Sequence, residues 1–170
     1  MLTLAALYLS LVATPYACPQ SFAVTGDALG PLRLRQDIST VTAAYNTTAE
    51  AFMDDGDGGV DYTVAICGDT HLVAMTEGKH TTIYQLSTGS PLFVTDTGAH
   101  VGMDVAELRR LYPQGRLNIR VGEGLVANFD TRAGVVFDLD QKTIPRHCYD
   151  VDCGAWTDHL KSVDIYIEAR

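Results

Sequence analysis

Residues 97–112, TGAHVGMDVAELRRLY, decide the predicted fold, because a weaker copy of this stretch lies earlier in the chain. The copies are 67 residues apart, so Asp37 aligns with Asp104 and Tyr45 aligns with Tyr112. Repetition at a fixed offset indicates a duplicated supersecondary unit. We therefore expect a single domain over residues 24–170, built from two repeats at about 25–94 and 95–170.

Each copy has the pattern of a short helix. Asp104 stands at an N-cap position and Glu107 follows three residues later, as in a capping box. Apolar residues then recur at helical spacing until Pro113 and Gly115 end the helix. In the first copy Asp37 is the predicted cap. Helices this short are marginal alone in water, so each must pack on neighbouring strands.

Alternating polar and apolar residues predict the strands. They are expected at residues 62–67, 71–76, 81–86, 116–121, 125–130, 135–140 and 163–168. Residues 46–61, rich in Asp and Gly, are predicted to be a surface loop, and residues 87–96 a link between the halves. The predicted fold class is α+β, a tandem repeat of a short helix plus an antiparallel β-meander, with the helices packed on one face of the sheet.

Composition and charge narrow the class of protein. Of the 170 residues, 46% are hydrophobic and 19% are charged, which is ordinary for a folded domain. The net charge of -9 argues against nucleic acid, because a phosphate backbone requires a basic face. An acidic surface by itself most often serves solubility.

The start of the chain resembles a secretory leader over residues 1–17, with a cleavage site left open up to residue 23. Its apolar run is shorter than the roughly 20 residues that span a bilayer, although no Lys or Arg precedes it. Cleavage before Cys18 would give a lipid-anchored cysteine, and cleavage near Ala23 would discard it. A retained, unlipidated Cys18 could pair with Cys67, but the sequence leaves all pairings open. We expect a periplasmic or secreted protein, with membrane contact only through an anchor at Cys18.

A second pair of cysteines lies near the C-terminus. Cys148 and Cys153 enclose four residues, with His147 and His159 close by, so a zinc site must be weighed against a disulfide. We predict the disulfide, because nearby cysteines usually join in an oxidising compartment. The aspartates of residues 54–61 depart from the spacing of an EF-hand, and a solvated acidic loop fits them better. No metal or cofactor is predicted.

Catalytic patterns are missing from the sequence. It contains neither a serine in a glycine-framed elbow nor a glycine-rich phosphate loop. We therefore predict that the protein is not an enzyme. The alternative is a hydrolase whose pair of carboxylates is unmarked in the sequence.

Aromatic and arginine side chains are the candidate partner-binding residues, because they commonly anchor protein interfaces. The candidates are Tyr62, Tyr84, Arg116, Arg120, Trp156 and Tyr166. An alternative interpretation puts the first two tyrosines in the core. It also pairs Arg116 and Arg120 across strands with Asp138 and Asp140.

A glycine-ended extended piece, a capped short helix and a meander together resemble small exported lipoprotein-type domains. Residues 102–112, GMDVAELRRLY, carry this resemblance, which is to the outer-membrane assembly lipoproteins of the SmpA/OmlA kind and, in tandem form, to the β-lactamase-inhibitory proteins. It covers most of residues 25–168, and the first copy departs from it with Arg35 in place of Gly102. The resemblance implies a binding module whose sheet face contacts another protein.

The expected function is therefore an exported protein-binding module of the cell envelope, such as an inhibitor or an immunity-like protein. An envelope assembly or structural lipoprotein is the alternative that acylation of Cys18 would favour. A hydrolase is the alternative that a cleft with convergent carboxylates of shifted pKa would favour.

Overall fold

A computed structural model describes residues 18–52, 58–78, 80–121, 125–144 and 154–169. In this part of the chain, strands form two sheets, and the helical elements are two short α-helices and the 3-10 helices η1 (Gln141–Thr143) and η3 (Gly154–His159). Cys148 and Cys153 lie outside the described residues, so the disulfide predicted between them stays a prediction.

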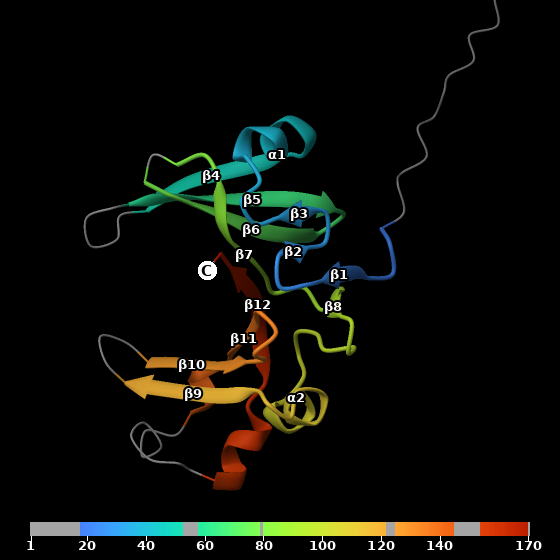
Figure 1. Ribbon diagram of the computed structural model, residues 1–170, viewed down its shortest axis with the longest axis vertical. Helices are drawn as coiled ribbons and strands as arrows, with labels where there is room; N and C mark the ends of the chain where they lie inside the picture. The colour runs from blue at the N-terminus through green and yellow to red at the C-terminus, as the bar shows by residue number, and fades with distance from the viewer. Residues whose placement is uncertain (1–17, 53–57, 79, 122–124, 145–153, 170) are drawn as a thin grey trace, which may run out of the picture.

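The larger sheet has eight described strands, all antiparallel, in the order β4-β5-β6-β7-β12-β11-β10-β9. They are β4 (Thr47–Phe52), β5 (Gly59–Cys67), β6 (Thr70–Glu77), β7 (Ile83–Thr88), β9 (Arg116–Val121), β10 (Leu125–Asp130), β11 (Val135–Leu139) and β12 (Ser162–Glu168). Pairing of β7 with β12 joins the two halves of the chain in one sheet. Figure 1 shows that the sheet is bent, with β4 to β6 and β9 to β10 on opposite arms of an open angle.

The smaller sheet consists of four short strands in the order β3-β2-β1-β8. They are β1 (Phe22–Val24), β2 (Ala28–Leu29), β3 (Leu32–Arg33) and β8 (Phe93–Thr95). β1 lies parallel to β8 and antiparallel to β2. The start of the described chain is therefore held against a strand about 70 residues further on.

Both helices begin at the predicted caps. α1 (Ile38–Ala44) starts after Asp37, whose carboxylate accepts from the Ser39 N–H. α2 (Val105–Leu111) starts after Asp104, which forms the predicted capping box with Glu107. The hydroxyl groups of Ser39 and Thr81 also donate to Asp37; the Ser39 hydrogen bond is the larger cause that lowers the pKa of this carboxyl.

A single hydrophobic core lies against one face of the larger sheet. Its largest fully buried side chains include Phe93 of the smaller sheet and Phe129 and Phe137 of the larger one. Each helix contributes two buried residues to this core, Ile38 and Val41 from α1, and Val105 and Leu108 from α2. The two helices and the smaller sheet thus meet the larger sheet through the same apolar cluster.

The predicted α+β tandem repeat is wrong. The part of the chain that the structure describes is mostly β, with 50% of those residues in strands and 16% helical, and its strands form two sheets. Seven-residue helices that bury two side chains each cannot form a layer of their own. Strands must satisfy their backbone groups on other strands, so the meander strands of the two halves pair through β7 and β12 in the larger sheet instead of forming two separate helix-and-meander units.

Two segments that were predicted to be irregular are strands. Residues 47–52 fall in the predicted loop, yet β4 pairs with β5 over six residues. Residues 93–95 fall in the predicted link, yet β8 lies in the smaller sheet, across the boundary proposed at residues 94 and 95. By contrast, the strands predicted at residues 116–121 and 125–130 coincide with β9 and β10.

A disulfide joins Cys18 to Cys67 at the end of β5, with 5.6 Å between their Cα atoms. This spacing is usual for a disulfide. The bridge ties the segment before β1 to the β5–β6 turn, and it is consistent with an oxidising compartment. Within the described residues, no helix has both the length and the apolar character of a membrane span.

Candidate functional site

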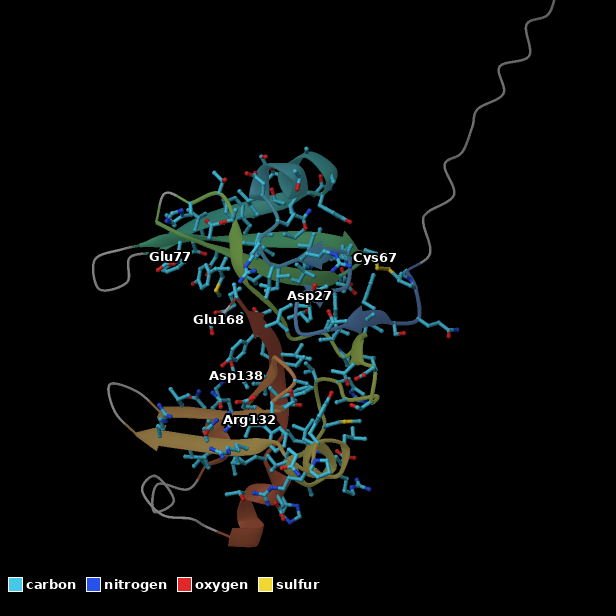
Figure 2. The ribbon with its side chains drawn as sticks, in the orientation of Figure 1. Asp27, Cys67, Glu77, Arg132, Asp138 and Glu168 are labelled. Atoms are coloured by element: carbon cyan, nitrogen blue, oxygen red, sulfur yellow. A yellow bond between two sulfur atoms is a disulfide. The ribbon has the colours of Figure 1, made fainter. Side chains whose placement is uncertain are left out.

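One face of the larger sheet packs on the core. On the opposite face, the described residues that border the sheet include the short 3-10 helix η1 (Gln141–Thr143), whose Gln141 and Lys142 line a groove there. Alternation along β12 sends Ile165 and Ile167 into the core, whereas Asp164 and Tyr166 lie on the opposite face. We call this opposite side of the larger sheet the open face. It lines the inside of the angle in Figure 1, and Figure 2 shows Asp138 and Glu168 on that side. Such a face is where an antiparallel sheet can meet solvent or a partner.

A row of four polar residues crosses the open face on four adjacent strands. Strand register aligns Asn118 with Asn128, Asn128 with Asp138, and Asp138 with Asp164. The two asparagines satisfy each other, since the Asn118 Nδ2 amide donates to Asn128 Oδ1 at 2.9 Å. The two aspartates cannot do so, because two ionised carboxylates have only acceptors to offer. Opposed side chains in such a pair lie about 5 Å apart at Cβ, so two like charges are held together.

Burial, as the larger cause, and the negative charge of Asp138 together raise the pKa of Asp164 from 3.8 to about 6, although hydrogen bonds from the backbone of Thr88 and Ile165 act in the opposite direction. The Thr88 N–H donates to Asp164 Oδ1 at 3.1 Å. Burial also raises the pKa of Asp138. Among the described residues, neither carboxylate has a cation within ion-pair distance. The pair therefore concentrates negative charge in a site that is only partly solvated.

A groove of about 510 Å³ runs beside this pair. Its lining includes Met75, Gln85, Ser87, Lys142 and Tyr166 in addition to the two aspartates. Burial raises the pKa of Tyr166 to about 12, helped by the negative charges of Asp138, Glu168 and Asp130. The phenol is therefore neutral at physiological pH and can both donate and accept a hydrogen bond.

A second pair of carboxylates lies on the outer arm of the same face. Register aligns Glu50 on β4 with Asp61 on β5, and Asp61 in turn with Met75. Burial raises the pKa of Asp61, and the charge of Glu50 adds to the effect. Asp61 Oδ1 is buried and has no hydrogen-bond partner among the described residues. Negative charge thus extends along the open face beyond the central groove.

Apolar side chains accompany these charges. Within the described chain, the large hydrophobic residues that count as exposed are Val126, at 46%, and Val163, at 48%. Val126 shares the open face with its neighbour Asn128 by alternation, and Val163 lines the groove. Exposed hydrophobic residues scattered singly are ordinary, so these two valines add apolar surface to the open face without marking a contact surface by themselves.

Four of the predicted partner-binding residues lie on or beside the open face. Tyr166 lines the groove, and the Tyr84 hydroxyl lies 3.8 Å from the sulfur of the groove residue Met75. Arg116 and Arg120 are exposed on β9, in register with Asp130 and Val126 on β10. The proposed pairing of these arginines with Asp138 and Asp140 is wrong, because β10 lies between β9 and β11.

The structure does not place the other two predicted partner-binding residues, Tyr62 and Trp156, on the open face. Tyr62 is partly buried against the core, on the opposite face from its neighbour Asp61. Trp156 belongs to the short 3-10 helix η3 (Gly154–His159), and its side chain lies outside what the structure describes. The structure does not test the binding role of any of the six.

Sequence reasoning missed the central aspartates. The sequence patterns name Asp138 only as a possible ion-pair partner of Arg116 and Arg120, and they do not single out Asp164. A signal was present, because Asp is depleted in strands and each of these two stands inside a predicted strand. No group of three or more potential metal ligands occurs among the residues that the structure describes.

Comparison with known proteins supports the fold and nothing finer. No family model and no curated protein matches this sequence. The structure is similar to the crystal structure of the uncharacterized protein yfeY from Escherichia coli, with a TM-score of 0.62 and 14% sequence identity. The match covers 88% of this chain and 99% of that chain. At this identity the similarity shows a shared fold alone.

Proposed function

We propose that this protein is an exported protein-binding module, and that the groove of its open face receives a basic segment of a protein partner. The observation that carries the proposal is the Asp138 and Asp164 pair, two neighbouring carboxylates that line an open groove on the side of the larger sheet away from the core. Two like charges placed side by side destabilise the sheet. A binding role explains why such a pair stands there.

A guanidinium or ammonium group fits this site electrostatically. A partner cation set between the two carboxylates would relieve their repulsion, and the interaction would be strengthened by the partial exclusion of water. Arginine suits the site better than lysine, because its planar fork of five donors can engage both carboxylates. The Tyr166 hydroxyl and the Gln85 amide at the groove offer further hydrogen bonds.

The surroundings of the pair have the composition of a protein interface. Val126 and Val163 supply exposed apolar surface, and Tyr84 and Tyr166 supply aromatic side chains. Aromatic and apolar groups that surround a few desolvated charges are what protein interfaces use for affinity and orientation. The resemblance of residues 102–112 to exported binding domains supports the same proposal.

Export to the periplasm or the medium is part of the proposal. Residues 1–17 have the composition of a leader, and the Cys18–Cys67 disulfide is the kind of bond that persists outside the cytoplasm. An inhibitor or an immunity-like factor would use the open face in this manner, by occupying a surface of its target.

The proposal is tested by capture of the partner on matched variants. The mature protein is immobilised as wild type, as D138N/D164N and as D69N/D96N, and each is exposed to envelope extract of the source organism. The control removes the same number of charges from exposed positions that do not line the groove. We expect one partner to be retained by wild type and by the control, and to be lost from D138N/D164N and at high salt. Equal retention on all three columns would overturn the proposal.

A hydrolase that uses the same pair is the second candidate, and the raised pKa of Asp164 favours it. A carboxyl group that titrates near 6 can act as a general acid while a neighbouring carboxylate acts as base or nucleophile. The two candidates differ in one measurement, because hydrolysis of a glycoside or ester panel by the wild type, abolished in D164N, supports the enzyme. Absence of turnover combined with selective capture supports the binding module.

A further inference from the structure

The N-terminal segment of the described chain is fixed at two neighbouring places. Its first described residue, Cys18, is bonded to Cys67, the last residue of β5. Four residues later the chain enters β1, the strand between β2 and β8 in the smaller sheet. The same short segment therefore carries both a covalent link to the larger sheet and the central pairing of the smaller one.

Packing around β1 shows which residues the fold needs. The Phe22 ring stacks on Phe93, with ring centroids 4.8 Å apart, and Phe93 is fully buried. The Phe22 N–H donates to the Leu92 carbonyl at 2.8 Å, and the Ala23 carbonyl accepts from the Gly30 N–H at 2.8 Å. A chain that began after Ala23 would lose these bonds and the ring that covers Phe93.

The chemistry of the Cys18 sulfur decides whether this residue carries a lipid anchor or a disulfide. Lipoprotein maturation forms a thioether between the cysteine sulfur and a diacylglyceryl group. The divalent sulfur of Cys18 cannot hold that carbon and the sulfur of Cys67 at the same time. A bridged Cys18 is therefore incompatible with a lipid anchor at the same residue.

We propose that the leader is removed on the N-terminal side of Cys18 and that Cys18 remains unacylated, so that the mature protein is released with the Cys18–Cys67 bridge. Cleavage consumes one water molecule at the peptide bond. Oxidation removes one hydrogen from each thiol, and the two electrons and two protons pass to an exported thiol oxidant, whose own disulfide becomes a dithiol. The proposal rests on the export included in the proposed function, and not on the partner.

Mass spectrometry and N-terminal sequencing of the full chain test the proposed processing and the Cys18–Cys67 bridge. The 170-residue sequence is produced with its own leader in a Gram-negative host, and the product is sequenced from its N-terminus and digested with trypsin without reduction. We expect the first residue to lie between positions 14 and 18. We also expect a linked pair of peptides, one ending at Arg33 and the other spanning residues 36–79, which separate on reduction. A bridge between Cys148 and Cys153 does not interfere, because both lie in the tryptic peptide 147–161.

Two matched variants separate a bridge from an anchor. Under the proposal, Cys18→Ser and Cys67→Ser behave alike, with both proteins in the soluble fraction and neither labelled by radioactive palmitate. Under lipid anchoring, only Cys18→Ser changes fraction, while Cys67→Ser stays in the detergent phase with its label.

Three results would overturn the inference. An acyl mass on Cys18, or a mature N-terminus at residue 19 or later, contradicts the proposed processing while leaving export intact. A product that keeps residues 1–17 and has free thiols at positions 18 and 67 contradicts export itself, and with it that part of the proposed function. Wild-type data suffice for each outcome, so poor folding of a variant does not obscure them.

Discussion

Replacement of Asp164 by Asn should stabilise the protein at neutral pH. The pKa of Asp164 is raised from 3.8 to about 6 by burial and by Asp138, so the folded state binds a proton more tightly than the unfolded state. A carboxyl group with a raised pKa contributes stability that is present when it is protonated. That contribution falls as pH rises from about 4 through 6.

The size of the effect follows from the shift. A shift of about two pKa units corresponds to roughly 3 kcal/mol, and partial solvent exposure of the side chain reduces this to about 1–2 kcal/mol. Asn keeps the Oδ1 that accepts from the Thr88 N–H and cannot ionise. We therefore expect D164N to unfold with a free energy about 1–2 kcal/mol above that of wild type at pH 7.5, and the two proteins to converge near pH 4.

Urea unfolding at pH 4, 5, 6 and 7.5 measures this difference. The comparison is made between variants at each pH, because Asp27 and Asp37 have lowered pKa values that give the opposite slope at the acid end. D96N serves as the control, since Asp96 is exposed and does not line the groove. The reasoning is refuted if D164N is less stable than wild type at pH 7.5, or if the difference between them does not change with pH.

Three further predictions concern the scaffold. Cys67→Ser should lower the free energy of unfolding by about 2–4 kcal/mol, because the bridge closes a loop with a sequence separation of 49; in urea titrations that contain reductant, the difference between wild type and the variant should disappear, because reductant also opens the predicted Cys148–Cys153 bridge in both. Asp104→Ala should cost about 1 kcal/mol through loss of the capping box, and a Glu107→Ala change added to it should cost less than it does alone, which a double-mutant cycle checks. Gly115→Ala should cost about 1–3 kcal/mol, because its Cβ would overlap the Phe129 ring; an unchanged melting temperature would contradict the packing described.

Local structure could be predicted where a segment carries its own signals. The N-caps at Asp37 and Asp104 predict where the two helices start without any tertiary information, because each side chain accepts a hydrogen bond from a backbone N–H within three residues. Alternation of polar and apolar residues located β9 to the residue, and the predicted turns on either side located β10. Each of these features depends on neighbours in sequence.

The errors come from contacts between distant segments. β4 contains Ala and Glu and lacks an apolar alternation, and it is a strand because β5 pairs with it. β1 and β8 are three residues each, and they exist through their mutual parallel pairing. Strands of three residues are too short to give a recognisable sequence pattern. The predicted α+β fold class therefore gave the helices too large a part and omitted the smaller sheet.

The candidate site could not be predicted from the sequence, because it also depends on pairing between distant strands. Asp138 and Asp164 face each other because β11 pairs with β12 across an insertion of more than twenty residues. Nothing local fixes that register. The sequence could name Arg116 and Tyr166 as candidate partner-binding residues, whereas their position relative to the aspartates depends on the strand order.

The central claim, that the groove of the open face binds a protein partner, is tested most directly by photo-cross-linking in living cells of the source organism. A photoreactive residue is placed at Gln85, which lines the groove, or at Ala43, which is exposed on α1. We predict a single cross-linked partner from position 85, lost in the D138N/D164N background although that variant is folded, and no such product from position 43. Identical products from both positions, or a product from position 85 that persists without the two aspartates, would contradict the claim.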